Sequence, residues 1–461
     1  MEFARQLQRD CPGLEVVTDP GILESHGQDW SYFRTPAPSA VVFPHSVEQV
    51  CELVRAAVRH RIPLVPSGGR TGLSGGAVAC SGEVVVSFDR MRRILDFNAV
   101  ERTVTVEAGV VTAELQAFAR DRGLYYPVSF ASEGSSQVGG NIATNAGGIR
   151  VIRYGMTRDR VAGLKVVTGT AEVLDCNRGL VKNASGYDFR HLFIGSEGTL
   201  GFVVEATMKL TDPPAPSRVM LLALDELAGV MPLFDLLQSS LGLSAFELFN
   251  DRCMHHVRQA HGLPDPLGQA APWYVVTEFD CPGESTERIA LECFERAVEN
   301  GWSRDGVISQ SEKQAADLWR YREGIAESVA HYPPYKNDVS VTVSRVPEFL
   351  LRLAELLDEV CPDYDVLYYG HVGDGNIHLN ILRPGGVSLE EFEARSNVIS
   401  RRSYELTREM GGSASAEHGI GLLKAHWLST TRSAAEIEMM RGIKRLFDPA
   451  GILNPGKLLP E

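Results

Sequence analysis

The chain contains 461 residues, more than a single hydrophobic core usually serves, and we therefore expect two domains. With 44% hydrophobic and 23% charged residues, its composition is that of a globular protein and excludes a disordered, fibrous or disulfide-stapled chain. The formal net charge of -14 and the lack of a basic segment argue against nucleic acid as a partner.

The sequence lacks signals for targeting and for metal clusters. The first residues, MEFARQLQRDCPG, mix both charge signs, and no stretch of about 18 apolar residues occurs along the chain. We therefore expect a cytoplasmic protein without a membrane span. The 8 cysteines are scattered without a C-x-x-C pair, which excludes a zinc knuckle and an iron–sulfur run.

The first part of the chain predicts an α+β domain with glycine-rich turns. Ser46 and Gln49 form a capping-box pattern ahead of an apolar helical face, and the strand-like run IPLV follows. The loop SGGRTGLSGG (67–76) comes next, and it is followed by the strand-like runs GEVVVSF and RTVTVEAGVV.

Two glycine-rich loops are candidates for binding phosphate. Backbone amides can surround a pyrophosphate only where side chains leave room, which suits residues 67–76 and the second loop, GGNIATNAGG (139–148). No G-x-G-x-x-G occurs, which argues against a Rossmann-type site. A G-x-S-x-G match surrounds Ser74, but a strand-like run rather than a helix follows it, so we interpret Ser74 as a loop residue. The P-loop-like tail at 451–457 lacks the final Ser or Thr and the helix.

The domain boundaries follow from proline and from the spacing of apolar residues. The cluster DPPAP (212–216) cannot continue a helix or a strand and ends the first domain. Amphipathic stretches then alternate with short strands, and a helix capped by Ser433 precedes the tail DPAGILNPGKLLP. We expect three segments, which are 1–213, 214–409 and 410–461.

The segment YYGHVGDGNIHLN, which starts at Tyr368, predicts a β-hairpin around Gly-Asp-Gly-Asn. If 373–376 is the turn, His371 faces His378, and both imidazoles can reach one ion. Asn380 projects from the same face as His378, because alternate residues of a strand share a face. Taken alone, this pair suits metal ligation and ordinary sheet packing about equally.

The segment SAEHGIG (415–421) supplies a third donor for such a site. His371, His378 and Glu417 would form a set of two imidazoles and one carboxylate. This set suits zinc best and also manganese or iron. His418 then remains as a base.

Four motifs, PSGGRTGLSGG, GGNIATNAGG, GSEGTLGFVVEATMKL and GILNPGK, resemble the flavin-binding signatures of the vanillyl-alcohol oxidase superfamily. The resemblance implies an α+β fold, with a two-part FAD-binding domain, an antiparallel-sheet substrate domain and a C-terminal helical segment that packs back on the FAD domain. Some members attach FAD covalently to a histidine after the paired glycines, and Arg70 at that position implies non-covalent FAD. The residues implied in FAD binding are Ser67, Gly68, Gly69, Arg70, Thr71, Gly72, Gly134, Ser135, Gly140, Asn141, Thr144, Gly198, Val203 and Asn454.

GHVGDGNIHLN and SAEHGIG resemble the metal and base motifs of the D-2-hydroxyacid dehydrogenase branch, most closely the D-2-hydroxyglutarate dehydrogenases. The resemblance implies that Arg322 and Lys336, here termed the carboxylate clamp, bind the far carboxylate of the substrate. Asn380 and His418 are implied as further substrate contacts. The resemblance implies a hydroxyl residue four positions after the arginine, but this chain has Ala326 there. The clamp therefore lacks one hydrogen-bond donor. Without the resemblance, both clamp residues would be interpreted as solvated charges.

The resemblance implies an FAD- and metal-dependent dehydrogenase that oxidises a small D-2-hydroxy acid to the 2-oxo acid. D-2-hydroxyglutarate or D-malate is favoured over D-lactate or glycolate. The metal would acidify the C2 hydroxyl, His418 would accept its proton, and the hydride would pass to FAD.

Several alternatives stay open at this point. A redox-neutral flavin transferase of the alkylglycerone-phosphate synthase kind shares the fold, and a serine hydrolase is a more distant reading. Because no cysteine cluster is present, we expect an external electron acceptor such as electron-transfer flavoprotein or a quinone. The oligomeric state is open, with a homodimer as one candidate.

Overall fold

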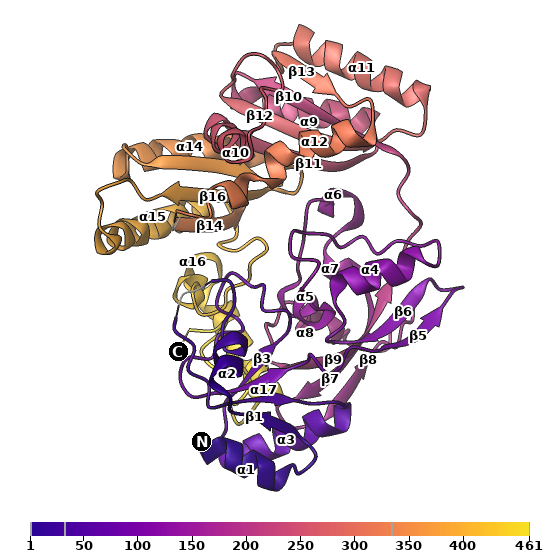
Figure 1. Ribbon diagram of the computed structural model, residues 1–461, viewed down its shortest axis with the longest axis vertical. Coiled ribbons are helices and arrows are strands. Elements are labelled where there is room, and N and C mark those ends of the chain that lie inside the picture. The colour runs from indigo at the N-terminus through magenta and orange to yellow at the C-terminus, as the bar shows by residue number, and fades with distance from the viewer. Residues whose placement is uncertain (1, 32–33, 333–334, 461) are drawn as a thin grey trace. The chain divides into compact units, whose positions relative to one another are not determined.

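The computed structural model describes residues 2–31, 34–332 and 335–460, and Figure 1 labels their helices and strands. None of the described helices combines the length and the apolar character needed to cross a membrane. The chain divides into two compact units. The first comprises Met1–Gly148, Gly155–Pro213 and Glu417–Glu461, and the second comprises Ile149–Tyr154 and Pro214–Ala416.

The first unit contains two sheets. The four-stranded sheet is parallel except at its edge strand β1, and its order is β1 (Glu15–Val17), β2 (Ala40–Phe43), β4 (Val84–Ser87) and β3 (Leu64–Ser67). The five-stranded sheet is antiparallel, in the order β5 (Ile94–Asn98), β6 (Thr103–Glu107), β9 (Gly201–Lys209), β7 (Val161–Thr168) and β8 (Val173–Cys176).

Helix α3 (Val47–His60) packs its apolar side against the four-stranded sheet, together with α1 (Glu2–Asp10). The hydroxyl of Ser46 accepts a hydrogen bond from the Gln49 backbone N–H, which confirms the predicted helix start. The valine-rich strands β2 and β4 are fully buried because helices and the second sheet cover them. Strand β3 ends at Ser67, so the loop 67–76 begins at its carboxyl end, which is where parallel sheets usually bind ligands.

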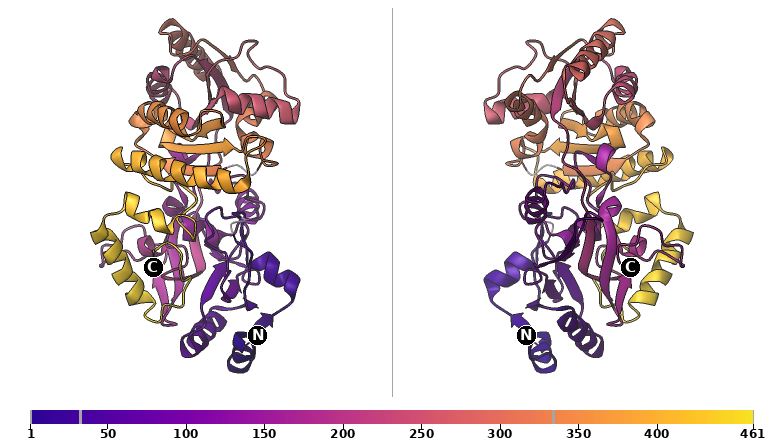
Figure 2. Two further views of the ribbon diagram at one scale, coloured as in Figure 1. Left: turned by 90° about the vertical axis from the view of Figure 1, so that its left-hand side faces the viewer. Right: turned by 90° about the vertical axis from the view of Figure 1, so that its right-hand side faces the viewer.

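The C-terminal residues belong to the first unit. Helix α17 (Ala434–Phe447) starts with the capping box of Ser433 and Glu436, as the sequence predicted. Phe447 packs on Phe193, and both views of Figure 2 show the yellow helix beside the strands of this unit. The remaining described α-helices here are α2 (Pro20–His26), α4 (Thr112–Arg120), α5 (Val138–Thr144), α7 (Thr157–Arg160), α8 (Arg190–Phe193) and α16 (Leu428–Thr431).

The second unit is built on an antiparallel seven-stranded sheet, which confirms the sheet type that the resemblance implied. Its order is β13 (Asp305–Ile308), β10 (Ser217–Leu224), β12 (Trp273–Asp280), β11 (Leu243–Asn250), β15 (Asp365–Gly370), β16 (Asn376–Leu382) and β14 (Tyr335–Ser340). The last two strands in this order carry three predicted site residues, which are His378 and Asn380 on β16 and Lys336 on β14.

Helices cover both faces of the central strands, which explains why every residue of β11 is buried. One face packs against α10 (Asp251–His261), α12 (Glu312–Glu323) and α13 (Ile325–Ser328). On the other face, Phe234 of α9 (Val230–Ser240) lies 4.9 Å from Phe246, measured between ring centroids. The other described α-helices of this unit are α6 (Val151–Tyr154), α11 (Glu284–Glu299), α14 (Val346–Val360) and α15 (Leu389–Glu409).

Candidate functional site

The residues implied in FAD binding all lie in the first unit, and several of their segments meet around the end of β3. A side chain at Gly69 would collide with the Ser135 carbonyl oxygen, so these two loops touch through their backbones. The Asn454 side-chain N–H₂ donates to the Gly76 carbonyl at 3.0 Å and to the Glu197 carbonyl at 2.7 Å. Four stretches that are distant in the sequence are thereby brought together.

The polar groups around this junction fit a bound dinucleotide. Within the described residues, the backbone N–H groups of Gly69, Arg70 and Thr71 donate to no protein atom. Three side-chain oxygens there are buried without a hydrogen-bond partner, namely Ser67 Oγ, Gln137 Oε1 and Asn454 Oδ1. Because buried polar groups are almost always hydrogen-bonded, this concentration indicates a ligand with many polar atoms. FAD has the phosphates and hydroxyls that would satisfy them.

Asn141 and Thr144, which are also implied in FAD binding, have hydrogen-bond partners inside the protein. The Asn141 side chain donates to Thr112 Oγ1 at 2.7 Å, and the Thr144 hydroxyl donates to the Gly140 carbonyl at 3.1 Å. Both residues lie on α5, and the Asn141 bond ties this short helix to the start of α4, whereas the Thr144 bond lies within the helix.

Arg70 is fixed by an ion pair. Its φ angle of 60° puts it in the left-handed region, and its guanidinium donates to the Gly68 carbonyl at 2.9 Å and to Asp89 at 3.3 Å. Although burial raises the pKa of Asp89, hydrogen bonds from His26 and Gln137 and the charge of Arg70 hold it well below its usual value. Asp89 therefore stays ionised and keeps Arg70 in place.

The loop of Glu417 and His418 is anchored within the first unit. The carboxylate of Glu197 accepts hydrogen bonds from the N–H groups of Ile420, at 2.7 Å, and Gly421, at 2.8 Å. The Ser74 hydroxyl donates to the His418 carbonyl at 2.7 Å. Gly421 is required here, because a side chain would collide with the Ser74 carbonyl oxygen. Ser74 is thus a loop residue, as predicted, and it holds His418.

In the second unit, the strand register gathers the substrate-site residues on one face. Lys336 on β14 pairs with Asn380 on β16, and Asp338 pairs with His378. On β15, Tyr369 pairs with His378. Because alternate residues of a strand share a face, these five side chains lie on the same side of the sheet.

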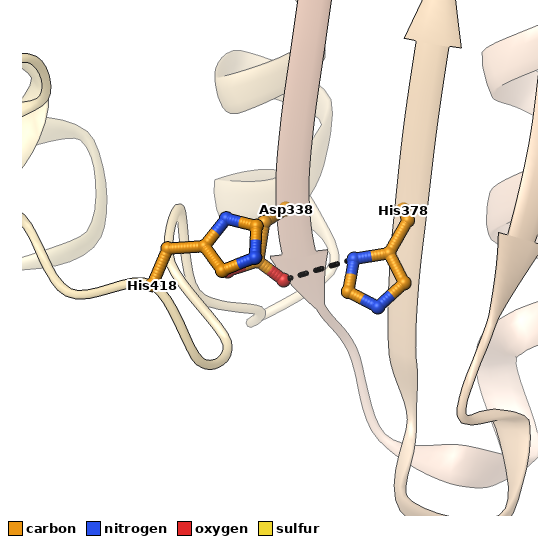
Figure 3. A group of neighbouring side chains, drawn as sticks. All are labelled: Asp338, His378 and His418. Carbon is orange, nitrogen blue, oxygen red and sulfur yellow. Dashed lines mark ion pairs between the residues drawn. The ribbon is translucent and has the colours of Figure 1, made fainter. Parts of the chain in front are cut away.

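The two predicted metal-binding histidines each face a buried carboxylate. His371 Nδ1 lies 2.8 Å from Glu247 Oε1, and His378 Nδ1 lies 3.5 Å from Asp338 Oδ1 (Figure 3). The centroids of the two imidazole rings are 5.2 Å apart. Metal-ligating histidines normally place their second nitrogen against a carboxylate or a carbonyl. In both residues Nδ1 is therefore the nitrogen next to a carboxylate, and Nε2 is the other ring nitrogen.

The register of this hairpin differs from the predicted one. We expected His371 directly opposite His378, but Tyr369 is the partner of His378 and β15 ends at Gly370. A short 3₁₀ helix, η3 (Val372–Asp374), lengthens the connection, and His371 lies just beyond the paired strands. Its imidazole still approaches that of His378, because His371 follows Tyr369 by two residues and points to the same side.

The residues that precede Glu417 are tied to the same sheet. Ser413 exchanges backbone hydrogen bonds with Ser340, and the Ala416 N–H donates to Asp338 Oδ2 at 3.2 Å. Glu417 follows directly, so its α-carbon lies about 3.8 Å from that of Ala416. Asp338, His371 and His378 belong to the second unit, whereas Glu417 and His418 are the first residues of the last segment of the first unit.

The arginine of the carboxylate clamp is buried rather than solvated. Arg322 Nε donates to Glu247 Oε2 at 2.8 Å, and its guanidinium carbon lies 5.0 Å from the centre of the Tyr369 ring. Burial raises the pKa of Tyr369 to about 12, so the phenol stays neutral and accepts from the Asn380 amide at 3.1 Å. Lys336, at the start of β14, is exposed.

Comparison with known proteins identifies the family. Residues 38–177 match the FAD binding domain, and residues 213–458 match the FAD linked oxidases, C-terminal domain. A D-2-hydroxyglutarate dehydrogenase of Xanthomonas citri pv. viticola is 55% identical over 452 residues, which cover 98% of this chain and 96% of the relative. The chain belongs to the D-2-hydroxyglutarate dehydrogenase family. A second member, from Stutzerimonas stutzeri, is 52% identical over 447 residues, or 97% of this chain and 96% of the relative.

Membership of this family makes the chain an FAD-dependent dehydrogenase, as the sequence motifs predicted. Among solved structures, p-cresol methylhydroxylase with bound substrate superposes with a TM-score of 0.76 at 15% identity, over 99% of this chain and 96% of that one. The likeness concerns the fold alone, and it confirms the two-domain architecture of the vanillyl-alcohol oxidase type.

Three residues of the site were missed by the sequence analysis, and the role of a fourth, Ser74, was not recognised. Glu247 and Asp338 support the histidines, and Glu197 supports the 417–421 loop. Ser74 was noted only as a loop residue, although it bonds to His418. One signal was available for Glu247, because a carboxylate inside the apolar run LSAFELFN must be paired if that strand is buried.

Proposed function

We propose that the chain oxidises D-2-hydroxyglutarate, the substrate after which its relatives are named, to the 2-oxo acid. The observation that carries the proposal is the pair of facing imidazoles, each against a buried carboxylate, on the sheet face that also bears Lys336 and Asn380. This face combines a metal-binding pair with a cation and an amide, which suits a hydroxy acid that has a second carboxylate.

His371, His378 and Glu417 are the residues that would hold the metal. Their fit is supported by the two Nδ1–carboxylate contacts, which would leave Nε2 of each imidazole for a metal, and by the bond that fixes Ala416 beside Asp338. Two imidazoles and one carboxylate favour zinc, with manganese or iron as alternatives. When bound, the metal would polarise the C1 carboxylate and C2 hydroxyl of the substrate and lower the pKa of that hydroxyl.

His418 is our candidate for the base that accepts the hydroxyl proton. The Ser74 hydroxyl donates to the backbone carbonyl of His418, and Glu197 accepts from the N–H groups of Ile420 and Gly421. The backbone that carries the imidazole is therefore fixed. FAD, when bound, would supply the acceptor for the C2 hydride. Arg322 and Lys336 would hold the far carboxylate through charge-assisted hydrogen bonds.

We expect FAD to be bound non-covalently. Arg70 occupies the position at which related flavoproteins use histidine, and the guanidinium is engaged by Asp89 and the Gly68 carbonyl. Acid precipitation of the purified protein should therefore release the yellow flavin into the supernatant. Flavin that stays with the pellet would contradict this prediction.

Substrate choice tests the proposed function. We expect kcat/KM to be higher for D-2-hydroxyglutarate or D-malate than for D-lactate, because two cations of the clamp can bind a second carboxylate. Ala326 removes one neutral donor, a loss of about 0.5–1.5 kcal/mol, which is too small to reverse that preference. Lys336→Ala should reduce the difference in kcat/KM between these substrates, chiefly by lowering kcat/KM for the dicarboxylate. The rates can be measured with an artificial electron acceptor.

Lys313→Ala is a matched control for this substitution. Lys313 is also an exposed lysine of the second unit, but it lies on α12 and pairs with Asp317. Its loss should leave the substrate ratio unchanged. If the unmutated enzyme prefers D-lactate, the assigned role of Lys336 is wrong and the chain acts as a D-lactate dehydrogenase.

The rival function, a redox-neutral flavin transfer, is disfavoured by the histidine pair, since a phosphate substrate has no need of it. We further propose that the reduced flavin is reoxidised by an external carrier such as electron-transfer flavoprotein or a quinone. All 8 cysteines are free thiols without cluster spacing, so the chain lacks the cysteine set of an internal iron–sulfur relay.

A further inference from the structure

One carboxylate on β11, that of Glu247, contacts both a proposed metal ligand and the clamp arginine. Its Oε1 lies 2.8 Å from His371 Nδ1, and its Oε2 accepts a hydrogen bond of 2.8 Å from Arg322 Nε. The side chains of Glu247 and Arg322 are only 1% and 8% exposed. Each oxygen therefore serves a different partner at a place where water cannot replace either one.

The strand register explains how one residue reaches both partners. Leu248 pairs with Gly370 and Phe249 with Tyr369, so Glu247 lies opposite the position that follows the strand, which is His371. Glu247 is also on the same face as Phe249 and Tyr369, because alternate residues share a face. Arg322 approaches this face from α12 and stacks on the Tyr369 ring.

We infer that Glu247 is a positioning residue that couples the metal ligand His371 to the carboxylate clamp. It holds the His371 tautomer that has its hydrogen on Nδ1, and it fixes the guanidinium of Arg322 by an ion pair. The inference rests on the proposed function and deepens it. One buried side chain would set the spacing between the metal and the far carboxylate, and hence the length of the substrate.

The chemistry of Glu247→Gln makes this inference testable. A carboxylate accepts from both neighbours, whereas an amide has one accepting oxygen and one N–H₂ group. If the oxygen accepts from Arg322, the N–H₂ faces His371 Nδ1 and favours the tautomer with its hydrogen on Nε2, and that nitrogen can then no longer bind a metal. If the amide is reversed, two donors meet at Arg322 and the guanidinium shifts.

The experiment uses the full chain with FAD bound and has two readouts. The first is metal affinity, measured as zinc retained at defined free zinc concentrations, which requires no turnover. The second is the ratio of kcat/KM for D-2-hydroxyglutarate and D-lactate. We expect Glu247→Gln to weaken zinc binding about 10–100-fold, the usual effect of losing a partner of a metal-ligating histidine, and to lower the substrate ratio several-fold.

Glu278→Gln is the matched control. Glu278 is a buried glutamate of the neighbouring strand β12 that pairs with Arg150 and accepts from the Trp319 indole. The Glu278→Gln variant should lose a similar ion pair, while its zinc affinity and its substrate ratio stay at the wild-type values. Equal losses in the two variants would overturn the inference, because they would reflect general destabilisation.

The remaining outcomes also decide the question. If Glu247→Gln changes neither the zinc affinity nor the substrate ratio, or changes only one of them, the proposed coupling of His371 to the carboxylate clamp is wrong. If this variant does not accumulate, Glu247→Asp keeps the charge but shortens the side chain, and we expect the same two losses from it. Failure of the unmutated enzyme to oxidise D-2-hydroxyglutarate would refute the proposed function, whereas the zinc readout would still test Glu247.

Discussion

His418→Ala is expected to reduce the rate of flavin reduction by D-2-hydroxyglutarate about 10²–10⁴-fold, which is the usual contribution of a positioned general base. The reason is that the C2 hydroxyl must lose its proton as the hydride leaves, and His418 is our candidate acceptor. Its backbone is held by Ser74, so substitution removes the imidazole without releasing the loop from that bond. The measurement is stopped-flow absorbance of the flavin under anaerobic conditions.

Two features separate a role in proton transfer from a structural effect. FAD and metal contents of the variant should equal those of the wild type, because His418 is neither in the proposed ligand set of His371, His378 and Glu417 nor among the residues implied in FAD binding. His426→Ala is the matched control, since His426 is an exposed histidine eight residues further along the same unit. It should keep the normal rate. Near-normal flavin reduction in His418→Ala would remove this residue from the mechanism.

The flavin-binding part of the fold was predictable because its requirements are local. The 67–76 loop follows a strand and contains glycines where the backbone meets another loop, as Gly69 does at Ser135. Such close approaches restrict the residue type at single positions, and they therefore leave a readable motif. The helix starts at Ser46 and Ser433 are local for the same reason, and the structure confirms both.

The supporting residues were not predictable because they depend on pairing between distant strands. His371 and Glu247 are 124 positions apart, and nothing near either residue specifies the β11/β15 register. The same limit explains the error in the hairpin. A turn at 373–376 is consistent with the glycines, but η3 occupies part of that segment, and this shifts the strand partner of His378 to Tyr369.

Removal of the metal is expected to abolish oxidation of D-2-hydroxyglutarate while FAD stays bound. The proposed metal ligands, His371, His378 and Glu417, are different residues from those implied in FAD binding. A chelator should therefore deplete the ion without removing the flavin. Without the ion, the C2 hydroxyl would keep a pKa far above that of an imidazole, and the proton could not pass to His418. Added Zn²⁺ or Mn²⁺ should restore the activity.

Substitution of one ligand tests the same site without a chelator. His378→Ala should lower the metal content at a fixed free zinc concentration, because it removes one of two facing imidazoles. His256→Ala is the matched control, since His256 also pairs with a carboxylate of this sheet, Asp365 at 2.7 Å, but is not one of the proposed metal ligands. It should retain both metal and activity. Full activity in a preparation that elemental analysis shows to be metal-free would refute the ligand set, because the acidity of the C2 hydroxyl would then have another origin.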